Sequence, residues 1–302
     1  MEMVESADTW RVGDVVITRV VELEITDLPP GVVFDNLTQE RVRDVPWLHP
    51  HYASPAGDLV VSIHAYVVES KGVRIIIDTC AGNDKPRHLP FFNMLSTSFL
   101  ERLAEAGFQP EDIDYVLCTH LHVDHIGWNT RWTGDAWVPT FPKAKYLFGR
   151  LEWEHWQSEI AQPESSEAAA EAQVLMEDSV KPILAAGLQQ LVETDHQITD
   201  ELKLFHTPGH TPGHVSVAIT SGGQSAVITG DIMHHPVQLA DAGLQASFDS
   251  DKTAAEVTRR AFIRDHEDRD VLVLGTHFAR PSGGWIVRDG AGWRLAPSRV
   301  TD

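Results

Sequence analysis

The stretch Thr119-His120-Leu121-His122-Val123-Asp124-His125 decides how this chain is interpreted. It follows the apolar run 113–118, which predicts a buried strand. Its three imidazoles and one carboxylate are the nitrogen and oxygen ligands that zinc and neighbouring metals prefer. Alternate residues His120 and His122 can project to one side of an extended chain. The pattern predicts two metal ions side by side, the first bound by His120 and His122, the second by Asp124 and His125. A surface loop that is merely rich in histidine is the alternative.

Three later positions offer the further ligands that two metal ions need. A turn rich in glycine and proline carries His210 and His214. Asp231 and His277 each come directly after an apolar run, at the carboxyl end of a predicted strand, where sites in such sheets are usually built. Each position alone is weak evidence, because a strand-end Asp often forms a turn. Together with the first motif, the count fits two metal ions that share a carboxylate.

Composition narrows the class of protein and its partners. The 302 residues, 42% of them hydrophobic, can form a substantial core. The net charge of −20 disfavours nucleic acid and anionic membranes as partners. Neither a membrane-spanning apolar run nor a secretory signal is visible, and the two cysteines, Cys80 and Cys118, are expected to be reduced thiols. These features predict a cytoplasmic location.

The order of strand-like and helix-like segments predicts one domain over residues 1–302. A proline-rich irregular arm is expected at about 27–58, and a helical insertion, with a lid as its alternative role, at about 151–191. The turn 70–72 predicts an antiparallel hairpin, and 253–266 predicts a helix capped by Ser250 or Asp251. The rhythm of these segments predicts two packed sheets with helices outside.

These residues resemble the metallo-β-lactamase superfamily in motif order, over about residues 12–295. The resemblance implies the α/β fold of that superfamily, an αββα sandwich of two mixed β-sheets flanked by helices. It implies that Asp231 bridges the two metal ions and that Asp78 and His214 support the ligands by hydrogen bonding. The remaining ligands divide into a set for each ion: His120, His122 and His210 for one, and Asp124, His125 and His277 for the other.

Departures from the family pattern narrow the resemblance to a subgroup. Asp231 stands where β-lactamases of the cysteine type place a thiolate, and His122 stands where flavodiiron oxidoreductases carry a glutamate. What remains is similar to the quorum-quenching N-acyl-homoserine lactonases and to methyl parathion hydrolase. Small lactonases carry a tyrosine three residues after the bridging Asp, and here that position is His234. His234 either substitutes as a donor to the substrate or simply packs.

The resemblance implies a hydrolase with two divalent ions, zinc first, with manganese, cobalt or iron(II) as alternatives. A hydroxide between the ions would attack a lactone or related ester, and Asp124, Asp231 and His234 are the candidate catalytic residues. A hydrolase of organophosphates, aryl esters or thioesters is the alternative, and a non-catalytic metal-binding protein is a third. A homodimer is a further expectation. Five apolar residues are candidate substrate walls, although each could equally belong to the core: Phe91, Phe92, Trp128, Trp132 and Met233.

Overall fold

The computed structural model describes residues 8–161 and 167–298, with only the backbone described for 167–169. Residues 162–166 of the expected helical insertion lie outside the described residues. The chain divides into two compact units. Unit 1 contains the described residues up to Leu23 and Ile63–Thr194, and unit 2 contains Glu24–Ser62 and the part from Asp195 onwards. The prediction of a single domain therefore stays a prediction.

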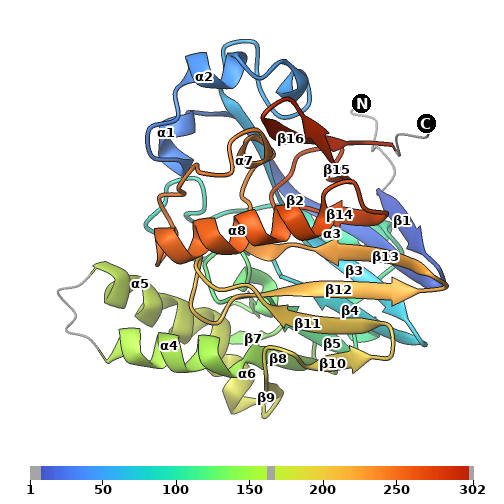
Figure 1. The fold of residues 1–302 in the computed structure, drawn as a ribbon. Helices are drawn as coiled ribbons and strands as arrows, with labels where there is room; N and C mark the ends of the chain where they lie inside the picture. Colours follow the sequence, from blue (N-terminus) through green and yellow to red (C-terminus); the bar gives the residue numbers. More distant parts are fainter. Residues whose placement is uncertain (1–7, 162–166, 299–302) are drawn as a thin grey trace. The chain divides into compact units, whose positions relative to one another are not determined.

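The strands of unit 1 belong to a seven-stranded mixed sheet of order β1-β2-β3-β4-β5-β8-β9, in which β2 and β3 continue into unit 2, and to the small β6–β7 hairpin. Figure 1 shows the helices α4 and α5 side by side. A π-helical turn, Met176–Val180, joins α5 to α6. The strands and helices are β1 Thr9–Val12, β2 Val15–Leu28, β3 Leu59–Ser70, β4 Val73–Ile77, α3 Phe99–Glu105, β5 Tyr115–Cys118, β6 Thr130–Trp132, β7 Trp137–Pro139, β8 Lys145–Gly149, α4 Arg150–Ile160, α5 Glu167–Leu175, α6 Lys181–Ala185 and β9 Gln189–Val192.

Unit 2 carries the second seven-stranded sheet, whose order β10-β11-β12-β13-β14-β15-β16 follows the sequence. Figure 1 shows α8 running across this sheet. Phe262 and Ile263 of α8 share a buried apolar cluster with Val227 and Val273 of the sheet. The elements are α1 Pro30–Val33, α2 Gln39–Arg43, β10 Gln197–Thr199, β11 Leu202–His206, β12 Val215–Ser221, β13 Gln224–Ile228, α7 Val237–Ala240, α8 Lys252–His266, β14 Val271–Leu274, β15 Gly283–Asp289 and β16 Gly292–Ala296.

The β3–β4 hairpin shows how local sequence fixes the register of the first sheet. Ser70 pairs with Val73, which leaves Lys71 and Gly72 as a two-residue loop. Both loop residues have positive φ angles, 52° and 82°, as the tight hairpin turns that match strand twist require. The predicted hairpin is thus confirmed, and its register sets the position at which β4 ends.

Parallel pairing places the candidate site residues at shared sheet edges. In unit 1, β4, β5 and β8 are consecutive parallel strands, so the residues that follow them emerge at one edge. Asp78 follows β4. The stretch 119–125, called the metal motif from here on, follows β5. In unit 2, β13 and β14 are parallel, and Asp231 and His277 come after their carboxyl ends. Carboxyl ends of parallel strands are where open α/β sheets place their ligands.

The expected α/β class with two mixed sheets and flanking helices is confirmed. The α8 cap at Asp251, whose side chain accepts a hydrogen bond from the Ala254 amide, is also as predicted. The strands β15 and β16 form an antiparallel hairpin. The arm 27–58 is less irregular than expected, since its prolines start α1 and a short 3-10 turn, Pro46–Leu48. Among the described residues, no helix is both long and apolar enough to cross a membrane.

Candidate metal centre

The histidines of the metal motif turn toward each other in unit 1. His120 is buried, and its Nε2 lies 3.0 Å from Nδ1 of His122. The other nitrogen of His120, Nδ1, lies 3.1 Å from Oγ1 of Thr119. Two imidazole nitrogens this close, on rings held by the same short loop, suit coordination of a common cation. The donor set present therefore fits a metal ion.

Asp78 braces this loop from the end of the neighbouring strand. Its carboxylate accepts the Thr119 amide at 2.8 Å and lies 2.9 Å from Nδ1 of His125. A ring that donates Nδ1–H to a carboxylate keeps the lone pair on Nε2, the tautomer that a metal ion requires. Asp78 has a φ of 57°, a left-handed conformation that Asp tolerates better than most residues. These contacts support the bracing role that the resemblance implies.

Glu22 on β2 fixes the loop that follows Asp78. Its buried carboxylate accepts the amides of Ala81 and Gly82, at 2.7 and 3.1 Å, and the indole N–H of Trp128 at 2.6 Å. Burial raises the pKa of Glu22, and these hydrogen bonds oppose that shift. Gly127 contacts the same loop so closely that an added Cβ would lie 1.9 Å from the Ala81 carbonyl. The segments that follow Asp78 and the metal motif are thus locked together.

Glu152 holds the middle of the metal motif. It lies in the first turn of α4, directly after β8, and is buried. Its Oε1 accepts the amide of Leu121 at 3.0 Å and the indole N–H of Trp156 at 2.8 Å. The Trp156 ring in turn contacts the His122 ring edge-to-face at 5.7 Å. Glu152 therefore fixes both the backbone between His120 and His122 and the Trp156 ring beside His122.

In unit 2, three imidazoles converge on one carboxylate. Nε2 of His277 lies 3.1 Å from Oδ1 of Asp231. Nε2 of His210 and Nε2 of His234 each lie 3.4 Å from Oδ2. All four residues are buried. Nε2 of His277 also lies 3.2 Å from Oδ2, so all three imidazoles surround that oxygen. Nitrogen and oxygen donors at these separations again fit a divalent ion.

Hydrogen bonds to the far ring nitrogens distinguish His210 from His214. His210 Nδ1 lies 3.0 Å from Oδ1 of Asp249, which directs Nε2 toward Asp231. His214 uses both ring nitrogens for the protein itself. Its Nε2 accepts the Asp231 amide at 2.8 Å, and its Nδ1 lies 3.0 Å from the Thr207 carbonyl. This arrangement favours His210 as the ligand and His214 as the support, as the resemblance implies.

His277 and His234 are also fixed within unit 2. Nδ1 of His277 lies 3.2 Å from the Ser62 carbonyl oxygen, and the His234 amide donates to Gln238 at 2.8 Å. Burial lowers the pKa of His234 to about 3. The loop that carries His234 is held by the fully buried Arg259, which donates to three backbone carbonyls, including Ala242 at 3.0 Å and Leu244 at 2.6 Å.

The five candidate wall residues occupy different environments. Trp128 and Phe92 lie in the apolar core of unit 1, against which Phe91 packs. Met233 is fully buried in the core of unit 2. Trp132 is 43% exposed and contacts Trp137 across the β6–β7 hairpin. Their assignment to a substrate pocket stays a prediction, and core packing accounts for Trp128 and Met233.

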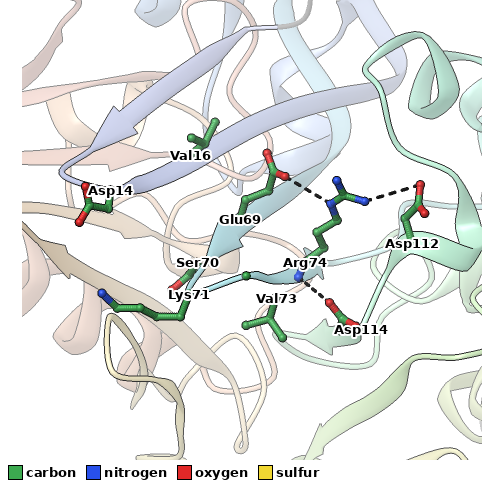
Figure 2. A pocket seen from close by; sticks show the side chains of 10 residues that line it. Asp14, Val16, Glu69, Ser70, Lys71, Val73, Arg74, Asp112 and Asp114 are labelled. Carbon is green, nitrogen blue, oxygen red and sulfur yellow. Dashed lines mark hydrogen bonds and ion pairs between the residues drawn. The ribbon is translucent and has the colours of Figure 1, made fainter.

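A surface pocket in unit 1 lies away from the metal motif. Figure 2 shows Arg74 between Glu69 and Asp112, with Asp114 accepting the Arg74 amide. This pocket lies at the amino ends of β4 and β5. Asp78 and the metal motif follow the opposite ends of these strands, so the pocket belongs to a different region of the unit.

Sequence reasoning missed the three buried carboxylates that support the candidate ligands: Glu22, Glu152 and Asp249. Glu22 is an acidic residue within a strand rich in β-branched residues, which is a usable but weak signal. Glu152 follows the carboxyl end of a strand, and that position could have identified it. Asp249 lies at the end of a long loop, and its sequence context carries no signal.

Comparison with known proteins supports what the geometry indicates. The model of the metallo-β-lactamase superfamily matches residues 58–277. An N-acyl homoserine lactonase from Bacillus sp. is 25% identical over 219 residues, which cover 68% of this chain and 78% of the relative. The chain therefore belongs to the metallo-β-lactamase superfamily.

Two solved structures resemble the whole chain. A crystal structure of the hydrolase AbOPH, of the β-lactamase superfamily, is 26% identical, with a TM-score of 0.82 and full coverage of both chains. AidC, described as a dizinc quorum-quenching lactonase in complex with a product, is 19% identical with a TM-score of 0.79, covering 98% of this chain and 99% of its own. At that identity AidC supports the fold alone.

Proposed function

We propose that the protein is a hydrolase with two divalent metal ions that opens lactones or related esters. The observation that carries this proposal is the buried Asp231 carboxylate, on which the Nε2 atoms of His210, His234 and His277 converge at 3.1 to 3.4 Å. The lactonase relatives support the substrate class. Ligands are assigned as the resemblance implies: His120, His122 and His210 for one ion, Asp124, His125 and His277 for the other, and Asp231 for both.

Zinc is the first candidate for both ions, since nitrogen and oxygen donors suit it, and manganese, cobalt and iron(II) accept the same donors. When bound, such ions activate water at neutral pH and polarise a carbonyl oxygen. The residues of this chain hold and orient the ions: Asp78 fixes the tautomer of His125, and Asp249 fixes that of His210. Asp124 and Asp231 are the carboxylates placed to accept and return protons.

The net reaction adds one water to the ester. Its oxygen bonds to the carbonyl carbon, the ring C–O bond breaks, and the released alkoxide takes up a proton, giving a hydroxy acid. Since this chain has His234 where small lactonases have tyrosine, hydrolysis of aryl esters or phosphotriesters is the second candidate. Only the walls of the substrate site, and not the ligands, would differ between the two.

The test compares substrates on one reconstituted protein. Zinc, manganese and cobalt forms are assayed on an N-acyl-homoserine lactone, an aliphatic lactone, an aryl ester and an aryl phosphotriester. We expect the highest kcat/KM on a lactone, with metal-free protein inactive until metal is restored. A preference for the ester or phosphotriester would move the protein to the second candidate. Bound metal without turnover of any of the four would reject the hydrolase proposal in favour of a metal-binding role.

We further propose a cytoplasmic homodimer. Cys80 and Cys118 are buried free thiols, which suits a reducing compartment. Light scattering of the purified protein tests the dimer, because a monomeric mass over the working concentration range would reject it.

A further inference from the structure

His234 is a buried imidazole with unsatisfied ring nitrogens. The residue is 6% exposed, and within the described part of the chain neither ring nitrogen has a hydrogen-bond partner. The ring is enclosed in unit 2 by His210, with centroids 4.7 Å apart, by the parallel ring of His277 at 6.3 Å, and by the edge-to-face ring of Phe34 at 6.4 Å. Leaving a buried polar group without a partner is destabilising. Simple packing therefore accounts poorly for a histidine here.

The position of Nε2 indicates what satisfies it. Nε2 of His234 lies 3.4 Å from Oδ2 of Asp231, the same oxygen that lies 3.4 Å from Nε2 of His210. Zinc–nitrogen and zinc–oxygen bonds are about 2.1 Å long, so two atoms bound to one ion lie no more than about 4.2 Å apart. Both separations are therefore short enough for one ion to bind Oδ2 and either ring nitrogen.

Asp249 orients His210 within the same cluster. Its Oδ1 is paired with Nδ1 of His210, which directs Nε2 of His210 toward Oδ2 of Asp231, beside which Nε2 of His234 also lies. Donor atoms of His210, His234 and Asp249 lie within 4.8 Å of one another. Two imidazole nitrogens beside one carboxylate oxygen point to a cation, which would accept electron pairs from all three atoms, and not to an anion or an apolar group.

We propose that His234 is an additional protein ligand of the metal ion that His210 and Oδ2 of Asp231 hold. It is then not a hydrogen-bond donor to the substrate in place of the lactonase tyrosine. This inference rests on the proposed metal centre and adds a ligand to it. His234 would then occupy a position that water or substrate could otherwise take on that ion, and the other ion would supply the polarisation of the carbonyl.

The backbone around His234 is built to hold such a ligand in place. The His234 amide donates to Oε1 of Gln238, whose own Nε2 donates to the Leu244 carbonyl. Arg259 donates to that same carbonyl and lies 3.4 Å from the Ile232 carbonyl. Support on both sides of the residue fixes the backbone from which the His234 ring extends.

The first test uses the unaltered protein. A crystal structure of the zinc-loaded form is expected to show a zinc ion about 2.1 Å from Nε2 of His234. Both ions bound with this nitrogen more than about 3 Å from either would overturn the inference, because a nitrogen at that distance is not bonded to zinc. Zinc-loaded protein that hydrolyses a lactone but shows the longer distance would reject the inference and leave the proposed function intact.

The second test measures metal affinity by competition with a chelator for His234→Ala. Loss of the ligand is expected to weaken the binding of one of the two ions by at least ten- to a hundredfold. Loss of a residue that only hydrogen-bonds to a ligand already has an effect of that size. The control is His51→Ala, since His51 is an exposed histidine of the same unit. Unchanged affinity for both ions, in a variant with unchanged circular dichroism, would overturn the inference. No binding by the unaltered protein would reject the inference and the proposed function together.

Discussion

The two units of the chain hold their candidate ligands with supports of opposite polarity. In unit 1, buried carboxylates accept backbone amides, as Glu152 accepts Leu121 and Glu22 accepts Ala81. In unit 2, the buried guanidinium of Arg259 donates to backbone carbonyls of the loop that carries His234. The candidate ligands of unit 1 come from one contiguous motif, whereas those of unit 2 come from three separate strand ends.

This difference shows how a buried charged side chain and the backbone groups around it satisfy each other in each unit. A short loop that turns sharply after a strand exposes amides, and an acidic side chain satisfies several of them at once. A long loop between β13 and α8 exposes carbonyls instead, which the five N–H donors of a guanidinium suit. Both kinds of support fix the backbone that carries the imidazole rings. The candidate ligands are therefore close to their metal-binding positions before an ion binds.

The largest expected effect is loss of the shared carboxylate. Asp231→Asn keeps the volume but halves the oxygen donors, and we expect kcat/KM to fall at least about a hundredfold, with loss of metal. The matched change in unit 1 is His120→Ala, with a loss of similar size. Metal content and rate are measured together. An Asp231→Asn protein with both ions and full rate would show that this residue is not a bridge.

A smaller effect is expected from the carboxylates that orient the rings. Asp78→Asn and Asp249→Asn each remove the charge that fixes a histidine tautomer, so metal affinity should fall about ten- to a hundredfold. Asp78→Asn should lie at the higher end, because Asp78 also accepts the Thr119 amide and hydroxyl. Chelator competition measures both. Equal losses would mean that the Thr119 bonds do not contribute.

The residues that could be predicted and those that could not differ in a physical way. The metal motif is contiguous, so its spacing alone indicates chemistry. His277 and Asp231 could be predicted because each follows an apolar strand. The carboxyl end of such a strand is where a sheet places side chains that bind ligands. Glu152, Glu22 and Asp249 act through contacts distant in sequence, which depend on strand order and helix direction.

Short elements were missed for a related reason. The strands β6, β7 and β10 have three residues each, too few for a period to be visible. The insertion was expected to be helical to about residue 191, yet β9 begins at Gln189, since pairing with β8 overrides local propensity. The π-helical turn that presents Asp178 to Arg87 likewise depends on its partner and not on local sequence.

A moderate loss of stability is expected when the amide support of unit 1 is removed. Glu152→Ala leaves the Leu121 amide and the Trp156 indole N–H without their acceptor, so unfolding free energy should fall by about 2 kcal/mol. Denaturant titration of the metal-free protein measures this without the contribution of bound ions.

The control for this loss lies on the same helix. Glu154 is exposed, so Glu154→Ala should change the unfolding free energy by no more than about 0.5 kcal/mol. Equal stability of the two variants would mean that Glu152 does not support the loop. In unit 1 the contrast between the units would then rest on the contact of Glu22 with Ala81 alone.

The last expected effect is a pH dependence of stability that arises in unit 1. The ammonium group of Lys85 is fully buried, 2.8 Å from Thr130 Oγ1, 3.5 Å from Asp178 Oδ1 and 3.7 Å from the Trp137 ring centroid. Burial lowers the pKa of Lys85 to about 7, with the Asp178 and Asp84 charges opposing the shift and Arg87 adding to it. In the unfolded chain this pKa is about 10.4.

Between these two values the unfolded chain holds a proton on Lys85 that the folded protein has released. The unfolding free energy should therefore rise with pH from about 7 to about 10, by at most about 1.4 kcal/mol per pH unit, and should show no such slope from this residue below pH 7. Lys85→Met should remove the slope, whereas Lys181→Met, at an exposed position, should retain it. Urea titrations of the metal-free proteins at several pH values measure the difference. A slope of the same size in Lys85→Met would assign the pH dependence to other titratable groups and not to Lys85.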